Sequence, residues 1–302
     1  MTLRNALIGA LVAISLTACG AGATTTGNGK IKVAASTNVW GSVVQAVGGD
    51  AVEVTSIIND PASDPHAYES KPADAVAVRE AELVIFNGGG YDDFFAKLLG
   101  TETEGAKKIE AFVVAGNEAH AAPDGAEHDH ETNEHVWYDL PTVKKVAEQA
   151  AVDLGEVAPD KKATFEANAK EFGTKIDALL ERVQKVKHEQ KVVATEPVAH
   201  YLLDAAVADD VTPEAFTKAV EAESDVPAAA LAETRQLVET KQIAVLIDNS
   251  QTENPVTKQL AESAKAQGIP VVSVSETLPE GVTGYLDWMT QQVDALVNAL
   301  GR

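Results

Sequence analysis

The sequence predicts an α/β protein with two lobes, because two series of short apolar runs alternate with amphipathic segments. The first series occupies residues 31–36, 52–58, 83–87 and, more weakly, 108–114. The second series occupies residues 191–196, 243–249 and 271–276. Continuous apolar strands that alternate with helices are typical of a parallel sheet covered on both faces. We therefore expect one parallel sheet in each lobe.

The amphipathic segments between these runs supply the expected helices. In the first lobe they include "VWGSVVQAVGG" and "DAVAVREA", and in the second "AAALAETRQLVETK" and "PVTKQLAESAKAQG". The last of these ends at Gly268, which is a typical residue for the end of a helix. The order of strands and helices thus predicts a layered fold for both halves of the chain.

Residues 159–190 lie between the two series and predict one long amphipathic helix. Apolar side chains recur in this segment at helical spacing. They are Phe165, Phe172, Ile176, Leu179, Leu180 and Val183. The segment lacks the composition of a flexible linker. We therefore expect a rigid connector between an N-terminal lobe at 30–158 and a C-terminal lobe at 191–302.

The first 18 residues read as a secretory signal peptide, with Arg4 before an apolar stretch of roughly a dozen residues and then small residues. The stretch is too short for a membrane-spanning helix of about 20 residues. Cys19 is the only cysteine, so no internal disulfide can form. The sequence "LTAC" followed by Gly20 resembles the lipobox of bacterial lipoproteins, which implies acyl chains on Cys19. An ordinary signal peptide is the alternative, and residues 19–29 predict a flexible tether.

The chain of 302 residues carries a formal net charge of −22. Such a charge repels a phosphate backbone, and no basic cluster offsets it, so nucleic acid is excluded as an expected partner. The acidic balance is compatible with a soluble protein that meets cations. A solvated acidic surface accounts for most of this balance.

Four potential metal ligands follow the predicted strands and loops: His66, His135, Glu196 and Glu276. Ligands of open α/β sheets bind beyond the carboxyl ends of the strands. Taken singly, each residue is more often an ordinary surface side chain. Two imidazoles and two carboxylates that converge on one cleft are instead typical of a transition-metal dication. The joint placement therefore predicts a metal site.

Several motifs, in order, resemble those of the cluster A-I family, the extracytoplasmic substrate-binding components of zinc and manganese ABC transporters. They are "GGDAVEV", "DPHAYESKPAD", "NGGGYDDFFAKLL", "EHVWYD", "TEPVAHYLLDAA", "LAETRQLVETKQIAVLIDNS" and "VSETLPEG". The resemblance runs from about Lys30 to the C-terminus. It implies two (β/α)4 lobes joined by one long helix, with a metal cleft between the lobes. It also implies a lipoprotein on the outer face of the cell membrane that delivers Zn²⁺ or Mn²⁺ to a permease.

The resemblance assigns the four candidate ligands one by one. His66 and His135 stand at the two histidine positions of the family. Glu196 occupies the third position, which is histidine in many zinc-type members and glutamate in some manganese-type members, and Tyr201 keeps the register. Glu276 falls where the family usually has aspartate. The sequence departs from the family there by one methylene group.

Other residues receive lesser roles from the same resemblance. Asp248 matches an acidic position near the family's cleft, and we expect it beside the ligands rather than on the ion. His200, one helical turn after Glu196, is the substitute ligand if Glu196 does not bind. Within the polar loop at 115–135, the stretch "HAAPDGAEHDHETNEH" resembles a shortened form of the family's His-rich loop. Three of its histidines are expected to capture metal weakly: His120, His128 and His130. A disordered acidic loop with incidental histidines is the alternative.

Two other functions remain as alternatives to transport. A metal-dependent hydrolase would usually keep an open zinc position for an activated water, whereas four protein ligands close the shell. The chain also has neither an H-E-x-x-H pair nor a G-x-S-x-G sequence. An adhesin of the same fold is the other alternative. We therefore expect a monomeric metal-binding protein that is not an enzyme.

Overall fold

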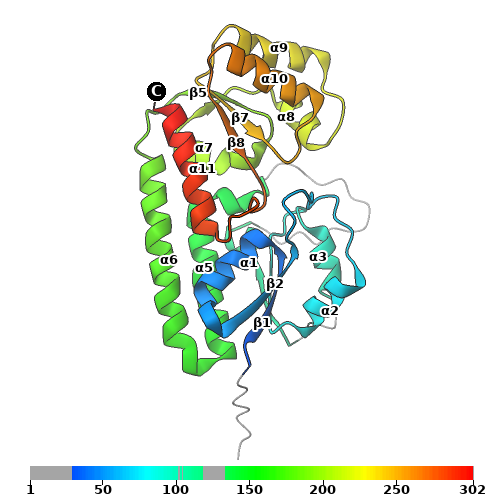
Figure 1. Ribbon diagram of the computed structural model, residues 1–302, viewed down its shortest axis with the longest axis vertical. Coiled ribbons are helices and arrows are strands. Elements are labelled where there is room, and N and C mark those ends of the chain that lie inside the picture. Colours follow the sequence, from blue (N-terminus) through cyan, green and yellow to red (C-terminus); the bar gives the residue numbers. More distant parts are fainter. Residues whose placement is uncertain (1–28, 101–102, 104, 118–132, 302) are drawn as a thin grey trace, which may run out of the picture.

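The computed structural model describes residues 29–100, 103, 105–117 and 133–301. These residues form two lobes that follow one another along the long axis of the molecule (Figure 1). Each lobe contains one four-stranded sheet in which all pairs of strands are parallel. The two parallel sheets predicted from the apolar runs are therefore present.

The N-terminal sheet has the strand order β2-β1-β3-β4. Its strands are β1 (Ile31–Thr37), β2 (Val52–Ile58), β3 (Leu83–Phe86) and β4 (Lys107–Glu110). Its helices are α1 (Asn38–Gly48), α2 (Pro72–Glu80), α3 (Asp93–Leu98) and α4 (Ala111–Val114). The prediction of a strand over 108–114 is wrong in its second half, because the buried Ala111 and Phe112 belong to the short helix α4.

The C-terminal sheet has the strand order β6-β5-β7-β8. Its strands are β5 (Lys191–Ala194), β6 (Asp209–Asp210), β7 (Val245–Asn249) and β8 (Val271–Val274). Its helices are α7 (His200–Ala205), α8 (Glu214–Glu221), α9 (Ala228–Glu239), α10 (Pro255–Ala266) and α11 (Tyr285–Leu300). Gly268 has a φ of 77°, which confirms its role after the end of α10. Strands β5 and β8 end two residues before Glu196 and Glu276, so both carboxylates lie just beyond the sheet.

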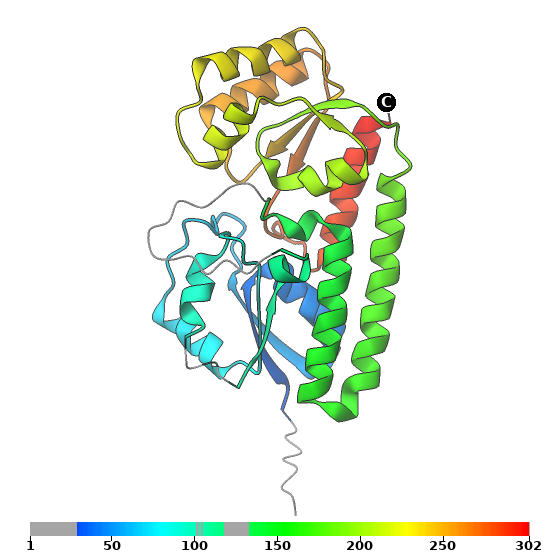
Figure 2. The same ribbon diagram turned by 180° about the vertical axis from the view of Figure 1, so that it is seen from behind.

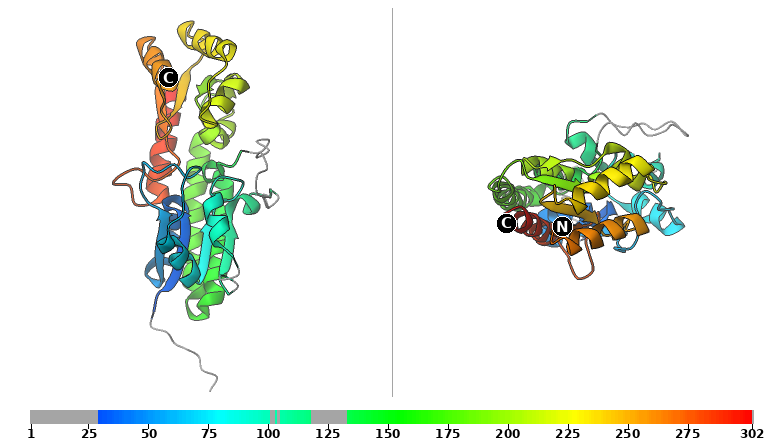
Figure 3. Two further views of the ribbon diagram at one scale, coloured as in Figure 1. Left: turned by 90° about the vertical axis from the view of Figure 1, so that its right-hand side faces the viewer. Right: turned by 90° about the horizontal axis from the view of Figure 1, so that it is seen from above.

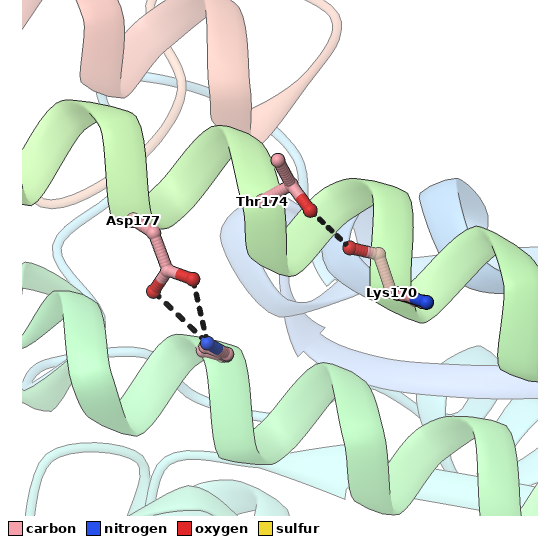
Figure 4. Close-up of polar contacts among 4 residues, drawn as sticks. Lys170, Thr174 and Asp177 are labelled. Atoms are coloured by element: carbon pink, nitrogen blue, oxygen red, sulfur yellow. Dashed lines mark hydrogen bonds and ion pairs between the residues drawn. The ribbon is translucent and has the colours of Figure 1, made fainter.

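The connector between the lobes is helix α6 (Lys162–Val183), which is shorter than the predicted span of 159–190. Residues after Val183 form turns, and Glu189 has a φ of 59°. Helix α6 lies beside α5 (Leu140–Val157) for most of its length (Figure 2). Both oxygens of Asp177 on α6 accept hydrogen bonds from the Lys144 ammonium on α5, at 2.9 and 2.7 Å (Figure 4). The connector is therefore braced by a neighbouring helix.

One hydrophobic cluster extends through both lobes, from Ile31 in β1 to Leu300 at the end of α11. Helix α11 follows the C-terminal sheet in sequence and packs against α6 and α1 (Figure 3). Buried hydrogen bonds also cross between the lobes. The Tyr285 hydroxyl donates to the Trp137 carbonyl at 2.7 Å, and the Tyr138 hydroxyl donates to the Ser275 carbonyl at 2.8 Å. Among the described residues, no helix has both the length and the apolar character to cross a bilayer.

Candidate metal centre

Three of the four predicted ligands meet between the lobes. His66 lies on the loop between β2 and α2, His135 directly precedes the 3₁₀ turn Val136–Tyr138, and Glu276 follows β8. One ligand atom from each residue lies within 4.8 Å of the other two. The two imidazole centroids are 6.5 Å apart. The N-terminal lobe thus contributes two nitrogens and the C-terminal lobe one carboxylate to a space suited to a single ion.

Glu196 lies beside this group but is not part of it. Its Oε2 accepts a hydrogen bond from Asn249 Nδ2 at 2.5 Å, and its Oε1 accepts one from the Thr252 hydroxyl. The same Asn249 amide donates to Glu276 Oε1 at 2.8 Å. The backbone amide of Gln251 donates to Asn249 Oδ1 at 3.2 Å, so the Asn249 Nδ2 is directed at the two carboxylates. One side-chain amide therefore holds both carboxylates together.

Asn133 determines which nitrogen of His135 is available to a metal ion. The Asn133 Nδ2 donates to the Pro197 carbonyl at 2.8 Å, and its Oδ1 accepts from the His135 backbone amide at 2.9 Å. Because this amide orientation is set by its partners, His135 Nδ1 must donate to Asn133 Oδ1 across 2.6 Å. Nε2 then keeps its lone pair for a metal ion.

The position of Asn133 is itself fixed by the C-terminal lobe, since the Tyr201 hydroxyl donates to the Asn133 carbonyl at 2.6 Å. Burial lowers the pKa of His135 well below its ordinary value, and His66 lowers it further. His135 is therefore neutral at physiological pH, which is the form that binds metal. The sequence analysis did not identify Asn133, and its only signal was its place two residues before a candidate histidine.

Glu276 differs from Glu196 in that only one of its two carboxylate oxygens accepts a hydrogen bond within the described part of the chain. Among the described residues, its Oε2 is buried without a hydrogen-bond partner, and the nearby Tyr91 hydroxyl lies outside hydrogen-bond geometry. Burial raises the pKa of Glu276 to about 8, and the charge of Glu196 adds to the effect. A buried carboxylate in this state requires either a proton or a cation.

Gln251 connects the Glu276 loop to the loop that carries His66. Its Oε1 accepts from the backbone amides of Glu276 and Thr277, the second at 3.0 Å. Its Nε2 donates to the Pro61 carbonyl at 2.7 Å, five residues before His66. This single side chain therefore sets the distance between ligand-bearing loops of different lobes. Like Asn133 and Asn249, it was missed in the sequence analysis.

The remaining predicted residues lie outside the group of three. Asp248 is buried, and its Oδ1 has no hydrogen-bond partner among the residues that the structure describes. Burial raises the pKa of Asp248 to about 6. His200 is half-exposed at the start of α7, where its Nε2 lies 3.6 Å from Asp204. Neither residue belongs to the cluster of His66, His135 and Glu276. The predicted loop histidines and the lipidation site lie outside the described residues: His120, His128, His130 and Cys19.

Residues 33–299 match the family model described as zinc-uptake complex component A, periplasmic. The chain belongs to this family. The match covers both lobes and the connector, including every candidate ligand. It confirms the family to which the motifs of the sequence pointed.

Curated relatives match over nearly the whole length. The manganese ABC transporter substrate-binding lipoprotein PsaA of Streptococcus pneumoniae is 26% identical over 311 residues, covering 97% of this chain and 96% of the relative. The metal ABC transporter substrate-binding lipoprotein FimA of Streptococcus parasanguinis is 24% identical over 304 residues, covering 95% and 94%.

Solved structures confirm the two-lobed fold. The periplasmic zinc-binding protein TroA of Treponema pallidum aligns with a TM-score of 0.72 at 17% identity, over 91% of this chain and 100% of TroA. A manganese-bound periplasmic metal-binding protein from Candidatus Liberibacter asiaticus aligns with a TM-score of 0.68 at 23% identity, over 89% and 98%.

Proposed function

We propose that this protein is the metal-binding component of an ABC importer, and that it captures a divalent transition metal outside the cytoplasm. The observation that carries the proposal is the convergence of His66, His135 and Glu276 from two lobes onto one point, in a chain of this family. The family and the curated relatives are transport components, so we propose no catalysed reaction. The delivered ion would pass to a membrane permease.

The cargo we propose is Zn²⁺ or Mn²⁺. Imidazole nitrogens suit zinc, whereas carboxylate oxygens also suit the harder manganese ion. The names of the relatives support both metals, since PsaA is a manganese-transport lipoprotein and TroA is a zinc-binding protein. The general order of affinities favours zinc at such a site. We therefore expect zinc to bind more tightly and manganese to bind measurably.

We assign His66, His135 and Glu276 as ligands, with Glu196 as the fourth. Glu196 is next to Glu276 through their shared contact with Asn249. A rotation of its carboxylate that releases Thr252 would let one oxygen reach the ion. Asp248 and His200 remain outside the ligand set in this assignment.

The proposed organisation places the metal-binding lobes outside the cell membrane. Residues 1–18 would be removed as a signal peptide, Cys19 would carry acyl chains, and residues 19–29 would tether the monomeric protein. The lobes would occupy 30–158 and 191–302, with the connector at 159–190.

Lipid chains contribute roughly 0.8 kcal/mol of membrane affinity per buried CH₂. We expect Cys19→Ser to release the protein from membranes, as fractionation and immunoblotting would measure.

Metal titration of histidine variants tests the proposed site. Binding free energies of about 10–16 kcal/mol over four ligands correspond to roughly two to three powers of ten in affinity per ligand. We expect His66→Ala and His135→Ala each to lose that much Zn²⁺ affinity. His188→Ala is the control, because His188 is exposed after the end of α6, where its Nε2 lies 3.3 Å from the Gln184 carbonyl.

Thermal unfolding gives a second measure of the same site. Metal at a hundredfold excess over its dissociation constant should stabilise the wild type by about 2.7 kcal/mol. The two site variants should lose this stabilisation, and His188→Ala should keep it. Full stabilisation of both site variants would contradict the assignment.

A further inference from the structure

A second group of potential ligands shares His135 with the proposed centre. One ligand atom from each of Glu134, His135 and Glu221 lies within 4.8 Å of the other two. Glu134 precedes His135 in the chain, and Glu221 is the last residue of α8 in the C-terminal lobe. This group therefore also draws its members from both lobes. Glu134 is the first residue of the motif "EHVWYD", whereas Glu221 lies outside the motifs that identified the first site.

Of the two carboxylates of this group, Glu134 is buried and Glu221 is half-buried. Glu134 is only 8% exposed, and the hydrogen bond to its carboxylate comes from its own backbone amide. Among the described residues, Glu221 Oε1 is buried with no hydrogen-bond partner. Removing a carboxylate from water without a donor or counter-charge is costly. A cation would satisfy both carboxylates and the imidazole at once.

A cavity of about 320 Å³ leads to these carboxylates. Its lining comprises Asn133, Glu134, Pro197, His200, Glu214, Thr217, Lys218 and Glu221. Since a water molecule occupies about 30 Å³ of liquid, the cavity has room for a cation that keeps part of its hydration shell. His200 is 44% exposed, so this lining reaches the surface. Lys218 Nζ lies 2.6 Å from Glu214 Oε1 and forms an ion pair with it.

We propose that Glu134, Glu221 and His135 form a second position for a divalent transition-metal cation, from which the ion passes to the centre at His66 and Glu276. Two oxygens and one nitrogen make this a harder and weaker site than the proposed centre. Because Asn133 engages His135 Nδ1, only Nε2 is left for a cation at either position, so the two positions would hold a cation alternately. The loading role rests on the proposed function, whereas the binding itself does not.

The test is a Mn²⁺ titration of the full chain followed by electron paramagnetic resonance, which distinguishes free from bound manganese. His66→Ala combined with Glu276→Gln removes the proposed centre and leaves the second position intact. We expect this double variant to retain one weakly bound Mn²⁺. Adding Glu221→Gln should weaken that residual binding by about tenfold or more.

Glu214→Gln in the same background is the matched control. It removes the same charge from the same cavity, but Glu214 is paired with Lys218 and lies outside the group of three. We expect it to change the residual affinity less than about twofold, within the usual effect of an exposed ion pair. Absence of residual binding would overturn the proposal. Equal losses for Glu221→Gln and Glu214→Gln would overturn it too, because they would show only a general effect of charge.

Association kinetics in the otherwise wild-type chain keep the proposal testable if the double variant does not fold. Stopped-flow fluorescence of Trp137, whose ring lies 5.0 Å from that of His135, reports arrival of the ion. Glu221→Gln should slow Mn²⁺ association about tenfold. An unchanged rate would overturn the loading role. A wild type that binds no Mn²⁺ or Zn²⁺ would instead contradict the proposed function.

Discussion

Glu196 and Glu276 occupy matching places in the C-terminal lobe and differ in how they are satisfied. Each lies two residues beyond a strand, and each accepts a hydrogen bond from Asn249. The Thr252 hydroxyl donates a hydrogen bond to the second oxygen of Glu196, whereas the second oxygen of Glu276 has no hydrogen-bond partner among the described residues. A place at the end of a strand therefore brings a carboxylate to the cleft. The oxygen without a hydrogen-bond partner distinguishes Glu276 as the carboxylate that can bind a metal ion without first losing a hydrogen bond.

The largest expected difference between these two residues lies in metal affinity. Glutamine keeps the size of glutamate and removes its charge, so Glu276→Gln and Glu196→Gln form a matched pair. We expect Glu276→Gln to weaken Zn²⁺ binding by two powers of ten or more, as for loss of a ligand. Glu196→Gln should cost less, about tenfold, because Glu196 reaches the ion only after its hydrogen bond from Thr252 is broken, which offsets part of what it contributes as the fourth ligand. Competition titration with a chelator measures both values, and equal losses would break the distinction.

Proton release provides a second comparison. The pKa of Glu276 is about 8, so at pH 7 the metal-free carboxyl holds a proton that metal must displace. Zn²⁺ affinity should therefore rise by about tenfold per pH unit between pH 6 and 8. Calorimetry in two buffers with different ionisation enthalpies should detect nearly one proton released. Glu276→Gln should abolish that release, whereas its persistence would assign the proton to another group.

The same raised pKa predicts the sign of the stability change in the metal-free protein. Because the folded-state pKa lies above the ordinary value of 4.5, the contribution of Glu276 is fully present below about pH 4.5. It is lost as the pH rises through about 8. Denaturant unfolding without metal should show a smaller loss for Glu276→Gln than for wild type, because burial also raises the pKa of Glu221 to about 8 and that contribution remains in the variant.

Metal selectivity tests whether Glu196 reaches the ion. Glu196→His exchanges an oxygen donor for an imidazole, and nitrogen favours zinc over manganese more strongly than oxygen does. We expect the ratio of zinc to manganese affinities to widen by about tenfold. Titration of both metals into the variant and the wild type measures the ratio. An unchanged or narrower ratio would place Glu196 outside the ligand set and return His200 to consideration as the third ligand.

The smallest expected effect concerns Gln251, which positions both Glu276 and the loop of His66. Gln251→Ala removes its hydrogen bonds to Pro61 and to the backbone of Glu276. We expect a loss of metal affinity of roughly tenfold or less. Gln242→Ala is the control, since Gln242 is exposed and donates to the Thr240 hydroxyl at the end of α9. A similar change in both variants would exclude a positioning role for Gln251.

Hydrophobic periodicity predicted the two sheets except for β6, because this two-residue strand consists of Asp209 and Asp210 and has no apolar residue. The run over 52–58 coincides with β2, because its apolar residues end at polar loop signals on both sides. The run over 108–114 contains a strand followed by a helix, and a short apolar run does not distinguish the two. Likewise, the charged residues after Val183 fit a helix, but the chain turns there toward β5.

The ligands were easier to predict than the residues that position them. His66, His135 and Glu276 stand out as polar side chains beyond predicted elements. Gln251 acts through Pro61, which lies 190 positions away in the sequence. Glu134 and Glu221 meet from different lobes in the same way. Such contacts leave no local pattern, because they depend on how the lobes are packed.

The hydrophobic cluster that runs through both lobes has a consequence for folding. Helix α11 comes from the C-terminal lobe and covers apolar residues of α1 and α6, so neither lobe closes its core alone. The two lobes are therefore topological units within one cooperative folding unit. Calorimetry should show one unfolding transition, and removal of α11 should destabilise the distant N-terminal sheet together with its own lobe. Release of the ion then has to proceed by local loop movement while the two sheets keep their relative orientation.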